Sequence, residues 1–280
     1  MKNVGIIGYG VVGKAFADVF EDKVRLFIYD KNMPEYNDIG RVVKNCPVLF
    51  VAVPTPMYED GSIDLSYVND VLNKISAVNP RRFKSPIITI RSTIVPGTTA
   101  ALQKKNPSLR LVYNPEFLSE RNSLADMERT DRVVIGGELK DCKKIEEIYR
   151  LVFPYARYII TDSTTAEMIK YSANVTLAGQ VMIANELYQI SQKLNVDWAF
   201  VRNAIILDPL IGRNTKVPGP DGDMGFGGKC LPKDLNALIY RAEEAGCDPE
   251  LLRHIWQLNL RMRKNKNWNA IKGATSKKRK

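Results

Sequence analysis

Short apolar runs alternate with helical patterns through the first 160 residues. The candidate strands are residues 4–7, 24–29, 48–53, 86–90, 109–113 and 132–135, each predominantly apolar, as in strands that are buried on both faces. Between them, residues 13–20 and 65–75 carry apolar side chains at helical spacing. This alternation predicts an α/β fold with a Rossmann-like, doubly wound parallel sheet.

The pattern changes near residue 164. Residues 165–194 contain no proline and one glycine, Gly179, and their apolar positions recur at helical period. About 30 residues of helix would span about 45 Å, a length typical of helices that cross a domain boundary or form a dimer interface. Further helices are predicted over 198–207 and 235–244, with Pro232 just before the second of these.

These patterns divide the chain into three parts. We expect an α/β domain over residues 1–163 and an all-helical dimerisation domain, built on the long central helix, over residues 164–260. A basic, disordered tail should follow over residues 261–280. The long helix makes a homodimer the expected assembly.

The net charge of +10 at pH 7 comes almost entirely from that tail. Nine of the 41 Lys and Arg residues lie between Arg261 and Lys280, which leaves 32 basic against 31 acidic side chains in the rest. The body of the protein is therefore nearly neutral and gives little reason to expect nucleic-acid binding. The tail has a single aromatic residue, Trp268, so a base-stacking platform is not favoured there either.

Cysteine and histidine usage excludes several kinds of site. The four cysteines form no C-x-x-C pair, and His254 is the only histidine, so we expect no metal site and no Ser-His-Asp hydrolase. The sequence contains no run of 18 apolar residues, so we expect no membrane-spanning helix. The chain enters its first strand directly after Asn3, without a signal-peptide pattern, which predicts a cytoplasmic protein with reduced thiols.

The segment Gly8-Tyr9-Gly10-Val11-Val12-Gly13 fits the G-x-G-x-x-G pattern, between a strand and a helix. In that context the first glycine makes the tight turn, the second admits a pyrophosphate, and the third allows close packing of helix and strand. Asp30 ends the second strand, where its carboxylate would bond ribose hydroxyls and repel a 2′-phosphate. NAD is therefore favoured over NADP, although Lys31 weakens the preference. The alternative is a structural glycine turn beside a solvated Asp30.

Cys230 lies in a glycine-rich segment just before a predicted helix. The helix dipole, together with Lys229 and Lys233, would favour its thiolate, and the neighbouring glycines would let a substrate approach the backbone. Asp234 would serve as a helix cap or as a proton acceptor. The alternative for Cys230 is a buried packing residue.

Other candidate groups follow strands or share a helix face. Lys170 and Asn174 are four residues apart, hence on one face, and could stabilise an oxyanion. Glu116 follows a strand and could act as a general base towards water, which Thr93 could help to place. Each group alone could equally be a solvated side chain, a cap or part of a turn.

Taken together, these segments resemble the UDP-glucose/GDP-mannose dehydrogenases, which oxidise a sugar C6 alcohol to a carboxylate with two NAD. The resemblance rests on motifs in the family's order: GYGVVG, VAVPTP, DGSIDLSYV, RSTIVPGT, NPEFLSE, DRVVIGG, AEMIKYSAN and GFGGKCLPKD. It implies that Cys230 adds to an aldehyde, that the thiohemiacetal is oxidised to a thioester, and that Glu116 activates the hydrolytic water placed by Thr93. It further implies that Lys170 and Asn174 stabilise oxyanions and that Asp234 assists proton transfer.

The resemblance also assigns binding residues. It implies that NAD contacts Gly8, Gly10, Val11, Val12, Gly13, Asp30, Val53, Pro54, Thr55 and Thr93. It implies that the substrate contacts Glu116, Phe117, Leu118, Glu120, Lys170, Asn174, Phe226, Gly227 and Arg213. No metal is implied.

Several departures from the family pattern concern the substrate. Family members usually continue into a C-terminal domain that binds much of the nucleotide, and this chain stops where that domain should begin, so a separate chain could supply it. Leu210 stands where an arginine often reaches the neighbouring subunit's substrate, and Arg213 could replace it. Arg121 stands where a glycine is common, and the loop 217–224 looks longer than usual. UDP-glucose is the first expectation, with GDP-mannose and UDP-N-acetyl sugars close behind.

Two other functions stay open. A β-hydroxyacid dehydrogenase joins a similar α/β domain to a helical one and carries a Lys and an Asn four residues apart, but it performs a two-electron oxidation that needs no thiol. A non-catalytic, dimeric NAD-binding remnant or scaffold would explain the short chain. The basic tail could also help to hold a substrate's diphosphate.

Overall fold

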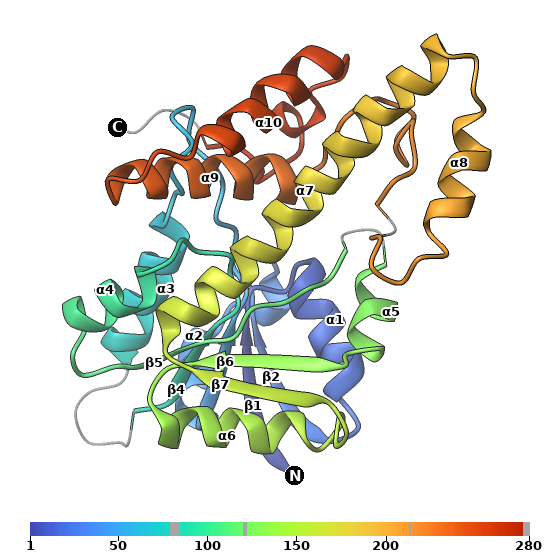
Figure 1. The fold of residues 1–280 in the computed structure, drawn as a ribbon. Coiled ribbons are helices and arrows are strands. Elements are labelled where there is room, and N and C mark those ends of the chain that lie inside the picture. Colours follow the sequence, from blue (N-terminus) through green and yellow to red (C-terminus); the bar gives the residue numbers. More distant parts are fainter. Residues whose placement is uncertain (79–84, 120–121, 213, 277–280) are drawn as a thin grey trace. The chain divides into compact units, whose positions relative to one another are not determined.

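The computed structural model describes residues 1–78, 85–119, 122–212 and 214–276 (Figure 1). The chain divides into two compact units. The first comprises Met1–Thr55 and Leu65–Lys170, and the second comprises Pro56–Asp64 and Tyr171–Lys280. The division therefore falls inside the long helix α7 (Ser163–Lys193), slightly beyond the boundary at residue 163 that the sequence predicts.

The first unit contains a seven-stranded sheet in the order β2-β1-β3-β4-β5-β6-β7. The strands are β1 (Lys2–Ile7), β2 (Val24–Tyr29), β3 (Val48–Val51), β4 (Ile87–Ile90), β5 (Arg110–Tyr113), β6 (Arg132–Gly136) and β7 (Arg157–Thr161). The Rossmann-like parallel sheet is confirmed for β1 to β5 and for the β6–β7 pair. One correction applies, because β5 and β6 pair antiparallel through Tyr113 and Gly136.

Helices cover both faces of this sheet (Figure 1). They are α1 (Val11–Phe20), α2 (Ile39–Asn45), α3 (Ser66–Val78), α4 (Thr98–Lys105), α5 (Ser123–Glu128) and α6 (Leu139–Tyr149), with a 3₁₀ turn η1 (Pro34–Tyr36). Alternate residues of β3 show the two layers, since Leu49 and Val51 pack into the core under α2 and α3, whereas Val48 and Phe50 pack into the core under α1 and α6. The predominantly apolar strands are explained by this burial on both faces.

The second unit is helical. Besides the C-terminal half of α7 it contains α8 (Trp198–Ile205), α9 (Cys230–Glu244), α10 (Glu250–Met262) and a 3₁₀ turn η2 (Asn267–Asn269). Val175, Ala178 and Met182 of α7 form its main core with Phe226 and Leu235. The predicted long helix is thus confirmed at 31 residues.

The expected disordered tail is corrected for residues 261–276. Arg261 and Met262 end α10, and Trp268 and Ala274 are buried. Ala274 accepts a hydrogen bond from the Met57 amide, which explains why residues 56–64 belong to the second unit. An indole ring and a backbone pairing therefore hold a segment that its charge pattern alone would leave in solvent. Residues 277–280 lie outside the described residues.

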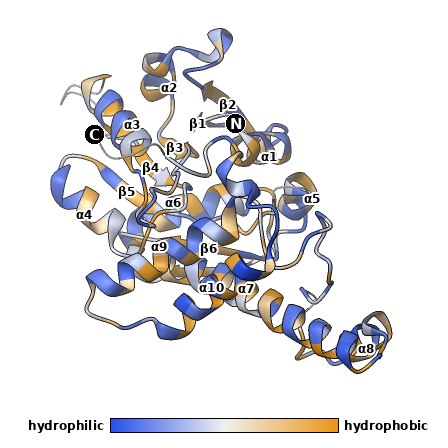
Figure 2. Cartoon of the chain, turned by 90° about the horizontal axis from the view of Figure 1, so that it is seen from above, coloured by the Kyte–Doolittle hydropathy of each residue, from blue (hydrophilic) through white to orange (hydrophobic). Residues whose placement is uncertain are grey.

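Large apolar side chains remain exposed on the C-terminal half of α7, directly after it, and on α8. They are Ile183, Leu187, Ile190, Leu194 and Phe200, of which Phe200 is 76% exposed. Figure 2 shows apolar residues along both helices. A cluster of this kind on the surface of a globular unit is typical of an interaction face.

The start of α7 packs tightly on β6. A Cβ atom built on Gly136 would lie 2.6 Å from the Cβ of Ala166, 2.6 Å from the carbonyl oxygen of Asp162 and 2.9 Å from the Cα of Ser163. Gly136 therefore lets the first turns of α7, which lead to Lys170, approach the backbone of the strand.

We predict that Gly136→Ala lowers the free energy of unfolding by about 1–3 kcal/mol, because the added methyl group meets backbone that cannot give way. Gly179→Ala is the matched control, since its Cβ would meet nothing closer than 3.8 Å. Replacing glycine by alanine inside a helix should instead raise the free energy of unfolding by about 0.5–1 kcal/mol. Urea denaturation of both variants tests the pair, and equal effects would contradict the packing argument.

Candidate active site

The glycine-rich turn after β1 has the geometry of a dinucleotide site. Gly8 has a φ of 96°, and its Cβ would lie 2.6 Å from the carbonyl oxygen of Ala52. The Cβ of a residue at Gly13 would lie 2.1 Å from the oxygen of Gly8, whereas a Cβ at Gly10 would meet nothing within 4 Å. Gly8 and Gly13 are thus needed for the turn itself, and Gly10 leaves open backbone at the start of α1. A pyrophosphate fits such a helix start.

Asp30 is oriented at the end of β2 by two backbone amides. Its Oδ2 accepts from the Tyr9 N–H at 2.9 Å, and its Oδ1 accepts from the Asn32 N–H at 2.9 Å. Each oxygen keeps a further lone pair for a ribose hydroxyl. The Lys31 ammonium lies 4.6 Å from the ring centre of Tyr67, so that charge has an aromatic neighbour of its own. These residues fit NAD, whose 2′-hydroxyl can donate to a carboxylate.

The loops after β3 and β4 are tied together. The Thr55 hydroxyl donates to the carbonyl oxygen of Thr93 at 2.7 Å, and the Ser92 hydroxyl donates to that of Val53 at 2.7 Å. The structure therefore brings together the predicted residues Val53, Thr55 and Thr93, with Pro54 exposed between them. They lie at the carboxyl ends of parallel strands, where open α/β sheets bind ligands.

Glu116 and Lys170 form a buried ion pair in the first unit. The Lys170 Nζ donates to Glu116 Oε1 at 3.1 Å, and the Leu118 N–H donates to Glu116 Oε2 at 2.6 Å. The Phe117 ring is contacted by two cations, with Lys170 Nζ at 5.5 Å and the Arg132 guanidinium at 4.4 Å from its centre. The two groups predicted as base and oxyanion stabiliser are thus in direct contact.

A buried polar network fixes the strand end that precedes Glu116. Asn114 accepts from the Arg91 guanidinium at 2.6 Å and from the Tyr149 hydroxyl at 2.6 Å, and its own amide donates to the Val134 oxygen at 2.7 Å. Burial raises the pKa of Tyr149, with Arg91 opposing the shift. Arg91 is not among the residues predicted from the sequence, although a charged residue directly after a buried strand was an available signal.

Glu167 is a second residue absent from the sequence-based prediction. Its carboxylate accepts from the Gly97 N–H at 2.6 Å, the Thr99 N–H at 2.8 Å and the Thr99 hydroxyl at 2.6 Å. It therefore connects the turn of α7 just before Lys170 to the amino end of α4. Burial raises the pKa of Glu167 to about 7, although the bonds from Thr99 and Gly97 oppose this shift. The available signal was a carboxylate on the buried face of the predicted long helix.

Asn174 and Asp234 meet in the second unit. The Asn174 amide donates to Asp234 Oδ2 at 2.5 Å, and the Lys233 Nζ donates to Asp234 Oδ1 at 2.5 Å. All three side chains are buried. Two predictions from the sequence change here. Lys233, which was expected to favour the Cys230 thiolate, pairs with the neighbouring Asp234. The amino end of α9 has no side-chain cap, so Asp234 does not serve as a helix cap.

Cys230 is the first residue of α9 and is partly exposed. It precedes Asp234 by one helical turn, so the two share a face. By contrast, Cys46 and Cys142 are buried, and burial raises their pKa values to about 12 and about 11. Thiolate chemistry is therefore far less accessible at those two positions than at a helix start.

The glycines before Cys230 have two different roles. A Cβ at Gly228 would meet nothing within 4 Å, as expected of open backbone, but the Cβ positions of Gly225 and Gly227 are occupied by side chains of α10 and of the segment after it. Of Gly225, Gly227 and Gly228, only Gly228 therefore has open backbone that a substrate could approach. Phe226, predicted to contact substrate, has its ring in the core of the second unit.

Two predicted substrate residues, Glu120 and Arg213, lie outside the described residues, as does Arg121. Among the residues that the structure describes, no group of three His, Cys, Asp or Glu side chains could hold a metal ion. None of the helices in the same part of the chain has the length and hydropathy to cross a membrane.

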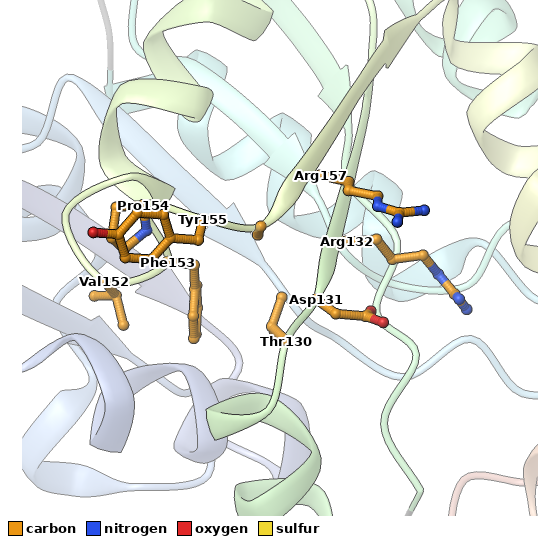
Figure 3. A pocket seen from close by; sticks show the side chains of 9 residues that line it. Thr130, Asp131, Arg132, Val152, Phe153, Pro154, Tyr155 and Arg157 are labelled. Carbon is orange, nitrogen blue, oxygen red and sulfur yellow. The ribbon is translucent and has the colours of Figure 1, made fainter.

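A surface pocket lies elsewhere in the first unit, at the amino ends of β6 and β7 (Figure 3). Its lining residues are Thr130, Asp131, Arg132, Val152, Phe153, Pro154, Tyr155, Ala156 and Arg157. None of them is a predicted site residue. Arg132 links this region to Phe117 through its ring contact.

We predict a pH-dependent contribution of Glu167 to stability. The pKa of this carboxyl is raised from its ordinary 4.5 to about 7, so the folded state binds more protons than the unfolded state between these values. The contribution of Glu167 to the free energy of unfolding should fall by up to about 3 kcal/mol as the pH rises through that window, and it should stay level above the window.

The test is urea denaturation at pH 5 and pH 8 of the parent, Glu167→Gln and the control Glu186→Gln, an exposed residue of the same helix. The difference between the parent and Glu167→Gln should change with pH, whereas Glu186→Gln should follow the parent. Equal pH dependence in all three proteins would contradict the prediction.

Comparison with known proteins agrees with this geometry. Residues 16–153 match the NAD binding domain of the UDP-glucose/GDP-mannose dehydrogenase family, and residues 164–261 match the central domain of the same family. The chain is 32% identical over 258 residues to a UDP-glucose 6-dehydrogenase of Rickettsia felis, covering 85% of this chain and 56% of the relative. A UDP-glucose 6-dehydrogenase of Rickettsia bellii is 36% identical over 224 residues, which cover 78% of this chain and 50% of that relative.

Solved structures show the same likeness. A UDP-glucose dehydrogenase of the archaeon Pyrobaculum islandicum superposes with a TM-score of 0.82 at 27% identity, over 93% of this chain and 68% of that one. A 3-hydroxyisobutyrate dehydrogenase of Mycobacterium tuberculosis shares the fold, with a TM-score of 0.73 at 17% identity over 93% of both chains. The chain spans about half the length of the curated relatives it matches. With both of its domains matched, the chain belongs to the UDP-glucose/GDP-mannose dehydrogenase family.

Proposed function

We propose that this protein catalyses the NAD-dependent, four-electron oxidation of a nucleotide sugar's C6 alcohol to the uronic acid, with UDP-glucose as the first substrate to test. One observation carries the proposal. Lys170 and Asn174, on successive turns of α7, each contact a buried carboxylate, and a partly exposed cysteine begins the helix that bears the second of these, Asp234. The relatives named UDP-glucose 6-dehydrogenase support the same reaction.

The first oxidation removes two electrons from the alcohol. When bound, NAD supplies the hydride acceptor for this oxidation and for the next. Loss of a hydride from C6 and of the hydroxyl proton leaves an aldehyde. Lys170 and Asn174, four residues apart in the sequence, are the proposed donors of hydrogen bonds to the oxygen on which negative charge develops. The ion pair with Glu116 keeps the buried Lys170 compensated before a substrate arrives.

The second oxidation requires the thiol. The Cys230 sulfur adds to the aldehyde carbon, and the resulting thiohemiacetal loses a hydride and gives its hydroxyl proton to a base, leaving a thioester. Asp234, one turn after Cys230, is the carboxylate proposed for proton transfer in the second unit. Covalent capture also keeps the aldehyde from being released.

Hydrolysis completes the reaction. Water attacks the thioester carbonyl, the C–S bond breaks, and the thiol of Cys230 is restored with the carboxylate as product. Glu116 is the proposed base for this water, because its oxygens already accept hydrogen bonds from Lys170 and Leu118 and stay oriented. Thr93 is proposed to help place the water, on the loop that Thr55 fixes.

One alternative is a two-electron oxidation of the β-hydroxyacid type. It would use Lys170 and Asn174 without the thiol, and the fold is compatible with it, since a 3-hydroxyisobutyrate dehydrogenase shares that fold. A non-catalytic NAD-binding scaffold is the other alternative. Product stoichiometry separates all three functions, since they yield two, one and no NADH per substrate.

For the reaction test, NADH formed per substrate consumed should be two for the parent with UDP-glucose, within a panel that includes GDP-mannose and UDP-N-acetyl sugars. Cys230→Ser should lower the rate of acid formation by at least about a hundredfold, because a hydroxyl is a far poorer nucleophile than a thiolate. Cys247→Ser, at an exposed cysteine, is the control and should match the parent.

One NADH per substrate, unaffected by Cys230→Ser, would establish the two-electron alternative. NAD binding without any NADH formation, across the whole panel, would favour the scaffold or a requirement for a partner chain.

We also propose a homodimer formed through the exposed apolar face of α7 and α8. Burying Phe200 and its apolar neighbours against a second copy would remove them from water. Phe200→Glu should therefore shift the sedimenting species from dimer to monomer, while Tyr155→Glu, at an exposed aromatic of the first unit, should leave it dimeric. A parent that sediments as a monomer at micromolar concentration would contradict this proposal.

A further inference from the structure

The loop that leads to Cys230 is held by asparagine side chains. Three of its backbone amides donate to them: Gly225 to Asn185 at 2.8 Å, Phe226 to Asn259 at 2.8 Å, and Gly228 to Asn267 at 3.0 Å. The Asn259 amide also donates to the Phe226 oxygen at 3.0 Å, so it pairs with that residue as a neighbouring strand would. The last of the three contacts is only two residues from the thiol.

Asn267 belongs to residues 263–276, which we call the C-terminal strap. Its first residue, Arg263, has a fully buried side chain that donates to the Met224 oxygen at 3.2 Å and forms an ion pair with Asp221. Trp268 lies against Trp256 of α10, with ring centres 5.3 Å apart. The strap is therefore anchored on the loop and on α10.

The far end of the strap is anchored as well. The Met57 amide donates to the Ala274 oxygen at 3.0 Å, and the Ser276 amide donates to the Met57 oxygen at 2.7 Å. The Ser276 hydroxyl donates to Asp64 at 2.8 Å. Asn267 is thus part of a segment held on both sides.

Gly227 shows how closely the strap approaches the loop. A Cβ there would lie 2.1 Å from an Arg263 guanidinium nitrogen and 2.6 Å from the Asn267 side-chain oxygen. These are closer than real Cβ contacts, so a side chain at 227 would displace the ends of the Arg263 and Asn267 side chains. Contact with the strap therefore explains why residue 227 is a glycine, without any need for substrate access at this position.

We propose that the C-terminal strap positions Cys230 and that Asn267 is its key positioning residue, acting through the backbone of Gly228. Gly228 has a φ of 76°, a conformation that glycine reaches and leaves at little cost. The hydrogen bond to Asn267 selects one conformation of this residue. The direction of the chain as it enters α9, and with it the place of the thiol, follows from that selection.

The catalytic consequence rests on the proposed function. The thiol takes part only after the first hydride has been removed, so a misplaced Cys230 should impair the second oxidation more than the first. Loss of the Asn267 contact should then release aldehyde and lower the NADH yield per substrate from two towards one.

The direct test does not depend on activity. In the full chain carrying Cys247→Ser, which removes the other exposed thiol, Asn267→Ala is compared with Asn269→Ala, an exposed asparagine two residues along in the same 3₁₀ turn. Amide hydrogen exchange of the peptide covering residues 225–230 and the iodoacetamide alkylation rate of Cys230 are both measured by mass spectrometry.

Asn267→Ala should speed exchange at least tenfold and change the alkylation rate at least threefold. Asn269→Ala should stay within twofold of the parent, and so should Asn267→Asp, which keeps an acceptor oxygen. Gly227→Ala disturbs the same contact from the loop side and should reproduce the effect if Asn267→Ala does not fold. Equal behaviour of Asn267→Ala and Asn269→Ala, whether both change or neither does, would overturn the proposal.

Activity provides a separate arm. If the parent yields two NADH per UDP-glucose, Asn267→Ala should yield fewer and release an aldehyde that hydrazine traps, and an unchanged yield would overturn the positioning role. If the parent yields no NADH with any sugar, the proposed function fails, whereas hydrogen exchange and alkylation still decide the role of the strap.

Discussion

Two buried ammonium groups impose the main constraint on this protein. Lys170 and Lys233 are almost fully removed from solvent, and each pairs with a carboxylate, Glu116 or Asp234. A buried charge without a partner is far more costly than the pair, so the strand ends and helix turns that bear the carboxylates must be held in register. Such pairs are poor sources of stability, because desolvation offsets their attraction. Glu116, Lys170 and Asp234 are also residues to which we assign roles in the proposed reaction.

The surrounding structure meets that constraint with buried polar networks. Asn114, held by Arg91 and Tyr149, fixes the strand end before Glu116. Glu167 fixes the turn of α7 before Lys170 by accepting three hydrogen bonds from residues at the start of α4. Asn114, Arg91, Tyr149 and Glu167 are not among the residues predicted to contact NAD or the substrate. They limit the positions that the charged pair can adopt, and in the proposed reaction a small misplacement of a reacting group would reduce its effect.

Glycines mark the places where backbone must come close, and the partner differs each time. At Gly13 the neighbour is the turn's own backbone, at Gly136 it is the first turn of α7, and at Gly227 it is the strap. Gly10 and Gly228, by contrast, leave open space suited to a ligand. Within one motif, some glycines are therefore required by close packing and others leave open backbone, and the sequence pattern alone does not distinguish the two.

Local sequence patterns were sufficient for a large part of this architecture, whereas contacts between distant segments were decided only by the tertiary structure. Apolar runs predicted the first six strands, and thirty residues without proline predicted α7, because each pattern reflects the burial of its own element. Strand β7 was not predicted, although Tyr158, Ile159 and Ile160 form a short apolar run, and this strand is only partly buried. The pairing of Lys170 with Glu116 spans 54 residues, and that of Asn267 with Gly228 spans 39. Hydrophobic periodicity determines which face of an element is buried, but it does not determine which polar partner the fold brings to that face. For the same reason the charges of the segment after α10 predicted disorder, whereas burial of its indole ring and backbone pairing with the distant residues 56–64 order it.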